Sequence, residues 1–372
     1  MWLSHLRLVL PDRVVGPGAL RLEAGRIAEV SPEPRADAEL KLPGHLLLPG
    51  LVDLHGDSLE RALEPRPGVV LPLELALPAW EAEQLAAGIT TAYAALCFWE
   101  GAAGVRALEH MQKVVEALAQ ERSRLDLELR LHLRYELSRP GGEAAVAEAL
   151  RRGWAHLLSF MDHTPGQGQF RSLEAYLRYM VQWLGRSPQE VEALLHERAQ
   201  EEGLESALRL AQQARALGVP LASHDDDQPE RVALMRGLGV RISEFPVRLE
   251  AARAAKGAGL WVLMGAPNLV RGGSHNGNLS AQEALEAGAL DALASDYLPA
   301  SMLRAVHRLY RGGWPLWRAV RLVSLHPARA AGLCDRGALA PGLRADLVLL
   351  QEETWQVRGV FVAGRPVYRR GW

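Results

Sequence analysis

The stretch LELRLHLRYEL, residues 127–137, indicates the fold of the whole chain. Apolar side chains occupy its odd positions, and charged or imidazole side chains occupy the even positions from 128 to 136. A period of two is typical of a β-strand whose two faces meet different surroundings. In a barrel the apolar face packs on outer helices and the polar face lies inside. The pattern predicts a barrel strand with Glu136 at its carboxyl end, where barrel enzymes place their chemistry.

Seven further strand-like stretches occur along the middle of the chain, and helical stretches such as 104–121 and 206–218 lie between many of them. Eight strands separated by helices is the count of a (β/α)8 barrel, which we expect over residues 49–336. Segment 167–202 is too long for an ordinary connection and has helical periodicity, so we expect a helical insertion there. The expected strands are 46–56, 89–97, 127–137, 156–163, 219–225, 240–246, 261–267 and 290–296.

Both ends of the chain have the pattern of β structure. Residues 6–30 and 343–370 contain short strands separated by proline and glycine, with hairpin turns in each segment. Two β-rich ends around a different middle predict one small β-sandwich domain, formed by residues 1–48 and 337–372 together.

Composition limits the class of protein. The formal net charge is −2 and 48% of residues are hydrophobic, which argues against a nucleic-acid or membrane-surface role. Cys97 and Cys334 follow no metal-ligand spacing and predict reduced thiols. Charges and a proline interrupt the N-terminal segment before a signal-peptide core develops, and no segment approaches the roughly 20 apolar residues of a membrane span. We therefore expect a cytoplasmic protein.

Side chains that bind metals stand at the carboxyl ends of five expected strands. His55 and Asp57 are two positions apart, so in a strand they point the same way. Imidazoles with carboxylates suit zinc, manganese or iron. Each such residue alone is more often structural, but their shared position at strand ends favours a metal centre. More than four ligands also permit two ions bridged by Glu136. The expected ligands are His55, Asp57, Glu136, His163, His224 and Asp296.

The motifs LPGLVDLHGD, GITT, LASHDD, ASDY and GLRADLVLL together resemble the amidohydrolase superfamily of metal-dependent hydrolases. The stretches MDHTPGQ and LMGAPNLVRGGSH are similar to its members that act in phosphonate utilisation. That resemblance implies a (β/α)8 metal-dependent hydrolase in which Asp57 replaces the usual second histidine. The chain departs from these relatives at Trp80 and Glu81 and near Tyr93, where they are more polar.

Asp296 on the last expected strand is the predicted general base, which takes a proton from the attacking water. The alternative is an aspartate that caps the next helix. His163 is either a metal ligand or the partner of one, with Asp162 as its competitor. His132 and Arg134 share the face of Glu136 but lie deeper, so an internal polar network is expected for them. The acids Asp225, Asp226 and Asp227 are expected to cap a helix or to stay solvated.

A phosphate-binding segment is expected between the seventh and eighth strands. Arg271 precedes Gly272 and Gly273, whose amides could form an anion-binding nest beside its guanidinium. His275 could act catalytically by donating to the leaving group. Arginine is abundant in the chain, so a surface role is the alternative for Arg271 and for Arg66. The expected substrate-binding residues are Arg66, Asn268, Arg271, Gly272 and Gly273.

Two hydrolytic functions share this ligand set. The resemblance implies hydrolysis of a phosphoanhydride, with alpha-D-ribose 1-methylphosphonate 5-triphosphate giving the 5-phosphate and diphosphate. The alternative is cleavage of a C–N bond, by an N-acyl sugar deacetylase or a cyclic amidase. The segment 268–278 favours phosphate, whereas an apolar pocket around Trp80 and Trp99 would favour an amide. A non-enzymatic member is disfavoured by the complete ligand set. We expect one or two divalent ions, zinc before manganese or iron, a small phosphorylated substrate, and a homodimer as one option.

Overall fold

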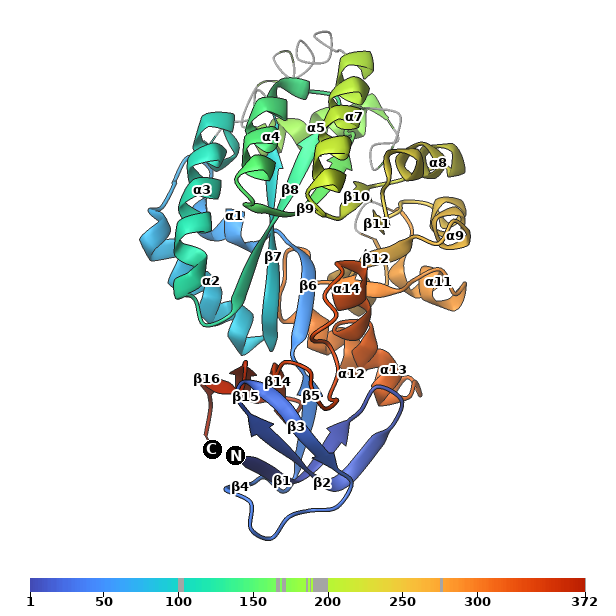
Figure 1. The fold of residues 1–372 in the computed structure, drawn as a ribbon. Coiled ribbons are helices and arrows are strands. Elements are labelled where there is room, and N and C mark those ends of the chain that lie inside the picture. The colour runs from blue at the N-terminus through green and yellow to red at the C-terminus, as the bar shows by residue number, and fades with distance from the viewer. Residues whose placement is uncertain are drawn as a thin grey trace.

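The computed structural model describes residues 1–99, 104–164, 168, 172–184, 187, 189, 200–274 and 277–371. Eight parallel strands follow one another in chain order around one sheet, as the (β/α)8 prediction requires (Figure 1). Each of the eight lies within or overlaps a stretch predicted from the sequence. They are β6 (Leu51–Gly56), β7 (Ile89–Phe98), β8 (Glu128–Glu136), β9 (Ala155–Met161), β10 (Leu221–His224), β11 (Ile242–Glu244), β12 (Trp261–Gly265) and β13 (Ala292–Ala294).

Helices surround the barrel on its outer side (Figure 1). The predicted insertion at 167–202 includes α5 (Leu173–Leu184) and the start of α7 (Gln200–Ala216), and many of its other residues lie outside the described part of the chain. Among the described residues, no helix has the length and apolar character needed to span a membrane. The other helices are α1 (Ser58–Leu63), α2 (Leu73–Ala86), α3 (Leu108–Glu121), α4 (Glu143–Arg151), α8 (Pro229–Leu238), α9 (Leu249–Gly257), α10 (Ala266–Arg271), α11 (Ala281–Glu286), α12 (Ser301–Arg311), α13 (Leu316–Arg321) and α14 (Leu325–Ala330).

A second sheet of eight strands is built from both ends of the chain, with strand order β16-β15-β14-β5-β1-β2-β3 and β4 paired to β1 (Figure 1). It has its own core, which includes Leu8, Leu47 and Phe361. The separate β domain formed by both termini is therefore confirmed, while its limits at 48/49 and 336/337 stay predictions. The strands are β1 (Trp2–Val9), β2 (Val14–Glu23), β3 (Arg26–Ser31), β4 (Leu40–Lys41), β5 (His45–Pro49), β14 (Leu347–Gln351), β15 (Val357–Val362) and β16 (Arg365–Arg369).

The apolar and polar residues that alternate along β8 lie on opposite faces of the strand, as the sequence predicts. Leu129, Leu131 and Leu133 are buried in the large cluster between the strands and the helices. His132, on the opposite face, is buried in the barrel, where its Nδ1 lies 3.1 Å from the Leu54 carbonyl oxygen and its Nε2 lies 2.9 Å from the Ser159 hydroxyl. The predicted internal polar network is present at His132.

The barrel closes between its first and last strands. At the carboxyl end, the Asp296 amide donates to the His55 carbonyl (2.9 Å) and the Asp57 amide donates to the Asp296 carbonyl (2.8 Å). Toward the amino end, the carbonyls of residues 322–323 accept hydrogen bonds from β6 and β13. This closure brings three of the predicted site residues together at one seam.

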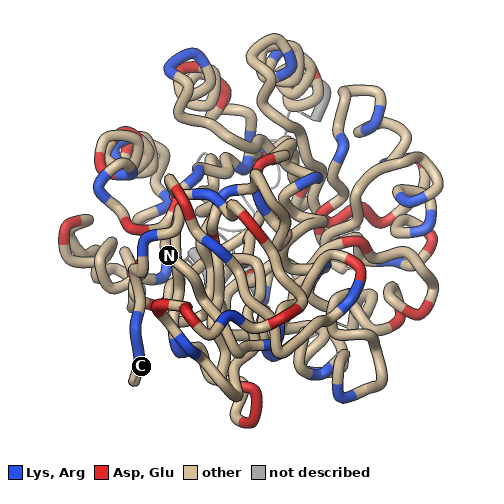
Figure 2. The backbone as a smooth tube through the Cα atoms, turned by 60° about the horizontal axis from the view of Figure 1, so that its bottom comes forward, with Lys and Arg blue, Asp and Glu red and all other residues tan. Residues whose placement is uncertain are grey.

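Figure 2 shows residues of both charge signs interspersed along the backbone, which fits the formal net charge of −2. Beneath the barrel, Glu128 joins the two domains through ion pairs with arginines. Arg336 Nη1 lies 2.6 Å and Arg130 Nε 2.7 Å from its carboxylate, and Arg344 also contacts it. Burial would raise the pKa of Glu128, but the neighbouring guanidinium groups, first that of Arg336, lower it to about 2.

This ion-pair cluster predicts a pH dependence of stability. Because the folded-state pKa of Glu128 lies below its ordinary value of 4.5, its contribution is complete above about pH 4.5 and is lost as the pH falls toward 2. We expect Glu128→Gln to lower the free energy of unfolding at pH 7 and to flatten its dependence on pH between 4.5 and 2. Urea titrations across this range measure both effects. An unchanged slope in the variant would show that Glu128 does not contribute to acid lability.

Candidate metal centre and active site

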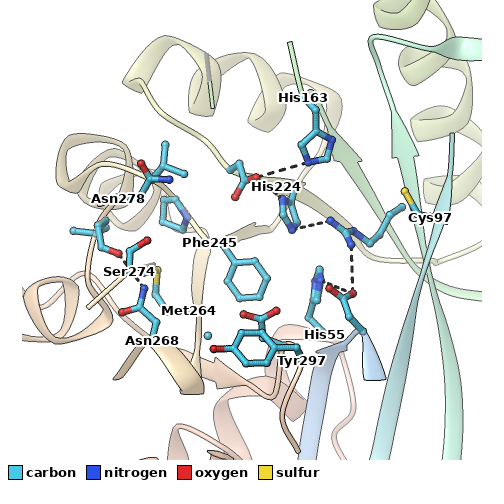
Figure 3. Close-up of a pocket in the computed structure, with 18 of the residues that line it drawn as sticks. His55, Cys97, His163, His224, Phe245, Met264, Asn268, Ser274, Asn278 and Tyr297 are labelled. Carbon is cyan, nitrogen blue, oxygen red and sulfur yellow. Dashed lines mark hydrogen bonds and ion pairs between the residues drawn. The ribbon is translucent and has the colours of Figure 1, made fainter. Parts of the chain in front are cut away.

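A cavity of about 500 Å³ opens at the carboxyl ends of the barrel strands. Figure 3 shows His55, His163 and His224 near one another on one side of it, with Asn268, Ser274 and Asn278 on the opposite side. This is the rim at which barrel enzymes place their active sites. The predicted site residues that line the cavity are His55, Asp57, His163, His224, Asn268, Arg271, Gly273 and Asp296.

His55 lies fully buried between two carboxylates. Its Nε2 is 3.4 Å from Asp57 Oδ1 and its Nδ1 is 3.4 Å from Glu244 Oε2. Neither ring nitrogen has a hydrogen-bond partner among the described residues. Burial would lower the pKa of His55, but Glu244 and Asp57 outweigh burial and raise it to about 10. The surroundings of His55 therefore stabilise positive charge, as a cation site must.

Glu244 at the end of β11 is a candidate ligand that our sequence analysis did not identify. It is fully buried, and neither carboxylate oxygen has a hydrogen-bond partner in the described part of the chain. Burial would raise its pKa, but His132 and His55 lower it to about 2, so the carboxylate is ionised. Ligand atoms of His55, His224 and Glu244 lie within 4.8 Å of one another. Its position at a strand end, like that of the predicted ligands, was the available signal.

A second group of candidate ligands overlaps the first. Ligand atoms of His163, His224 and Asp225 also lie within 4.8 Å of one another. Asp225 has a left-handed backbone (φ 59°), and its Oδ2 lies 3.1 Å from His224 Nδ1. Asp226 is buried beneath it and accepts hydrogen bonds from the hydroxyls of Ser223 and Ser243. The expectation that these two acids cap a helix or stay solvated is therefore wrong, because both point into the protein.

Glu136, which the sequence predicts as a bridging ligand, contacts His163 and Ser138 in the structure. Its Oε2 lies 2.6 Å from His163 Nδ1, and its Oε1 accepts from the His163 amide at 3.0 Å and from the Ser138 hydroxyl. It is fully buried and does not line the cavity. Carboxylates that hold the Nδ1–H of a histidine fix the ring so that Nε2 faces a metal. The contacts of Glu136 fit that supporting position behind His163.

Arg134 lies on β8 two residues before Glu136, and it lines the cavity. Its Nη1 lies 3.3 Å from Asp57 Oδ1 and its Nη2 lies 3.2 Å from His224 Nε2. The internal polar network expected for Arg134 therefore extends to two predicted metal ligands. Arg106 also lines the cavity and donates from Nε to Glu60 at 2.5 Å. Arg106 could not be predicted as a site residue from the sequence, because it lies in a stretch whose only pattern is helical.

Asp296 is held at the seam of the barrel, with a left-handed backbone (φ 55°) and its side chain at the cavity. Beside it, the buried Asp53 carboxylate accepts from the Ser295 amide (2.9 Å), the Ser295 hydroxyl (2.5 Å) and the His55 amide (3.3 Å). Burial, with a further contribution from the charge of Asp57, raises the pKa of Asp296 to about 7. A carboxylate with such a pKa is suited to accept and release a proton near neutral pH.

The predicted phosphate-binding segment is only partly assembled at the cavity. The amides of Gly272 and Gly273 both donate to the Asn268 carbonyl at 3.1 Å, because they terminate α10 as a left-handed C-cap. They are therefore not free to form an anion nest. The Asn268 side chain donates to the Leu279 carbonyl and accepts from the Ala281 amide, and so joins α10 to the start of α11. Arg271 lines the cavity at the end of α10.

Two other predicted site residues fall elsewhere. Arg66 is exposed in the connection between α1 and α2 and does not line the cavity. His275 lies outside the described residues. The positions at which the chain departs from its relatives also lie away from the cavity. Trp80 is buried in α2 with Nε1 on the Ser58 hydroxyl, and Tyr93 is buried in β7.

Comparison with known proteins agrees with this architecture. Residues 191–367 match the amidohydrolase family. The chain is 39% identical to the alpha-D-ribose 1-methylphosphonate 5-triphosphate diphosphatase of Escherichia coli K12, over 94% of each protein. Similar solved structures include 5-methylcytosine deaminase from Klebsiella pneumoniae (TM-score 0.69, 18% identity, 100% of this chain and 99% of that one). N-acetyl-D-glucosamine-6-phosphate deacetylase from Mycobacterium smegmatis is also similar (TM-score 0.68, 18% identity, 99% and 100%). The chain belongs to the amidohydrolase family of hydrolases.

Proposed function

We propose that the chain hydrolyses alpha-D-ribose 1-methylphosphonate 5-triphosphate to the 5-phosphate and diphosphate in phosphonate catabolism. The observation that carries this proposal is that one cavity combines an imidazole–carboxylate cluster with Arg106, Arg134 and Arg271. A triphosphate is strongly anionic, so its binding beside carboxylates requires cations to offset repulsion. The relationship to the Escherichia coli diphosphatase supports the same substrate.

The buried donors at and beneath this cavity fit a divalent metal ion. Both nitrogens of His55 and both oxygens of Glu244 lack hydrogen-bond partners among the described residues, although His55 and Glu244 lie 3.4 Å apart, and buried polar groups without hydrogen bonds are costly. With His224 they supply the imidazole and carboxylate ligands that zinc, manganese or iron prefer. When bound, such an ion lowers the pKa of a coordinated water and polarises a phosphoryl oxygen.

The residues around the ligands can carry the remaining steps. Asp296, the predicted base, accepts a proton from the attacking water as the water oxygen forms a bond to phosphorus. The P–O bond to the departing diphosphate then breaks, and the guanidinium groups of Arg106 and Arg271 offset the charge that develops on it. Asp296 subsequently releases its proton to solvent. Arg134 holds Asp57 and His224 in place during these steps.

Arg271→Ala is expected to slow triphosphate hydrolysis without changing metal content. Loss of one charge-stabilising donor typically costs about 2–4 kcal/mol in the transition state, which corresponds to a decrease of roughly 30- to 1,000-fold in kcat/KM. Arg66→Ala is the matched control, since Arg66 is exposed away from the cavity, and its kcat/KM should stay within about threefold of wild type. Equal losses in both variants would remove the special role of Arg271.

Glu136→Gln is expected to weaken metal binding by about 10- to 100-fold, the usual effect of losing a carboxylate that supports a ligating histidine. Glu143→Gln provides a control in the helix that follows β8, because Glu143 begins α4 and pairs with Arg209 outside the cavity. Metal affinity is measured by competition with a chromogenic chelator. Unchanged affinity in Glu136→Gln would show that His163 needs no such support.

Amide hydrolysis is less well supported by the cavity. Trp99 lines it and stacks on His163, with ring centroids 6.1 Å apart, but Trp80 is buried in α2. The apolar pocket that would favour an amide is therefore not formed around both tryptophans.

The two functions are tested by comparing hydrolysis of the ribose phosphonate triphosphate with deacetylation of N-acetylglucosamine 6-phosphate by the metal-loaded protein. Turnover of the amide alone would overturn the proposal. A cytoplasmic location, the use of zinc and a homodimer stay predictions.

A further inference from the structure

Phe245 has a backbone conformation that its residue type does not favour. Three residues that line the cavity are left-handed: Asp225 (φ 59°), Phe245 (φ 52°) and Asp296 (φ 55°). Aspartate adopts this region fairly readily, whereas a bulky side chain there is an outlier. A proline follows Phe245, and a residue before proline favours extended backbone instead. Such strain persists only where the surrounding structure imposes it, and it concentrates at functional sites.

The left-handed turn brings two consecutive side chains to one imidazole. Successive side chains of a strand point to opposite faces, so in a continued β11 the Phe245 ring would point away from Glu244. Instead both flank His55: Glu244 Oε2 lies 3.4 Å from His55 Nδ1, and the Phe245 and His55 rings have centroids 4.8 Å apart at an interplanar angle of 64°. The Phe245 amide donates to the Leu263 carbonyl of β12 at 2.8 Å, which ties the turn to the next strand.

The orientation of His55 depends on packing rather than on hydrogen bonds. Neither of its ring nitrogens has a hydrogen-bond partner in the described part of the chain, although a histidine that binds a metal is normally oriented by a hydrogen bond from its other nitrogen. The half-buried Phe245 ring lines the cavity and also meets the His224 ring, with centroids 5.3 Å apart and planes at 89° (Figure 3). The His132 ring packs on His55 as well, but it does not line the cavity. Phe245 therefore supplies the wall that His55 has on the cavity side.

We propose that Phe245 is a positioning residue, held in a strained left-handed backbone so that its ring fixes the His55 imidazole. This inference rests on the proposed metal centre, in which His55 and Glu244 are ligands, and it assigns a role to a side chain that has no acid, base or ligand atom. Glycine fits a left-handed position better than any residue with a Cβ. The ring at position 245 is therefore present at a cost in stability.

Phe245→Ala and Phe245→Gly separate the ring from the backbone. Both remove the ring, and we expect both to weaken Mn²⁺ binding by about 10- to 100-fold, the usual effect of losing a group that orients a ligating histidine. Only glycine also relieves the left-handed backbone, so Phe245→Gly should unfold a few degrees above Phe245→Ala. Competition with a chromogenic chelator measures the affinity, and calorimetry of the metal-free proteins measures the unfolding temperatures.

Two results of these measurements would overturn the proposal. Wild-type affinity in both variants would show that the ring positions no ligand. Equal unfolding temperatures of the alanine and glycine variants would show that residue 245 is not strained. If Phe245→Ala fails to fold, Phe245→Gly alone still decides whether the ring supports metal binding.

Trp355→Gly is the matched control. Trp355 is also an aromatic residue with a left-handed backbone (φ 58°), but it lies between β14 and β15, stacks on His307 and does not line the cavity. Its loss should lower the unfolding temperature, because the ring belongs to the hydrophobic core, while metal affinity stays within about threefold of wild type, as for distant independent sites. A loss of affinity equal to that of the Phe245 variants would show that affinity follows overall stability, and would overturn the proposal.

A crystal structure of metal-free Phe245→Gly tests the inference without the proposed metal centre. We expect the His55 ring to occupy more than one conformation once the Phe245 wall is removed. A single, unchanged ring position would overturn the role of Phe245, whether or not the wild-type protein binds an ion. Conversely, a wild-type protein that binds Mn²⁺ but hydrolyses no triphosphate would overturn the proposed function and leave the role of Phe245 in place.

Discussion

Asp296→Asn is expected to lower kcat by about 10²- to 10⁴-fold, the usual contribution of a positioned general base. The amide keeps the shape of the side chain but cannot accept the proton of the attacking water. Asp296 is the only described carboxylate lining the cavity whose pKa is raised, to about 7, by burial and by the charge of Asp57. Steady-state kinetics of the metal-loaded variant measure the loss.

The metal content of Asp296→Asn should equal that of wild type, since Asp296 belongs to neither candidate ligand group. Asp291→Asn is the matched control, because Asp291 lies just before the same strand and pairs with Lys256, away from the cavity. Its kcat should remain within a few-fold of wild type. A normal kcat in Asp296→Asn would remove its assignment as the base, and loss of the ion would instead identify it as a ligand.

Glu244→Ala is expected to abolish metal retention during desalting, with a larger loss of affinity than the 10- to 100-fold expected of a supporting carboxylate. The reason is that both Glu244 oxygens are buried without a hydrogen-bond partner among the described residues, and Oε2 lies 3.4 Å from His55 Nδ1. Thermal unfolding should then no longer respond to added metal, because an ion that does not bind cannot stabilise the folded state.

Comparing the loss of metal in the Glu244 and Glu136 variants makes this result decisive. The sequence predicted Glu136 as the bridging ligand, whereas the structure gives its oxygens to His163 and Ser138. We therefore expect Glu244→Ala to lose more metal than Glu136→Gln. The reverse order would restore the original assignment of Glu136 and contradict the centre described above.

The strands could be predicted because each carries its own signal. Period-two alternation on 127–137 and apolar runs elsewhere depend only on local burial, and the barrel follows from their number. Polar residues at the carboxyl ends of barrel strands meet at one rim, and this rule predicted the shared position of five residues that line the cavity: His55, Asp57, His163, His224 and Asp296.

Which strand-end carboxylate lies beside His55 could not be predicted in the same way. Glu136 and Glu244 both end barrel strands, but the Ser138 hydroxyl and the His163 amide donate to Glu136, whereas Glu244 Oε2 lies 3.4 Å from His55 Nδ1. Gly272 and Gly273 were expected to offer free amides. However, α10 ends at Arg271, and the Asn268 carbonyl accepts hydrogen bonds from both amides. These outcomes depend on side-chain rotamers and on helix ends, which residue type and spacing do not determine.

Identification of the products tests the central claim most directly. Metal-loaded protein is incubated with alpha-D-ribose 1-methylphosphonate 5-triphosphate, and phosphorus NMR follows the products over time, with Asp296→Asn as the inactive reference. The account predicts equal amounts of diphosphate and alpha-D-ribose 1-methylphosphonate 5-phosphate, with no single phosphate released. Release of single phosphate, or an unchanged triphosphate in a preparation that deacetylates an N-acyl sugar, would contradict it.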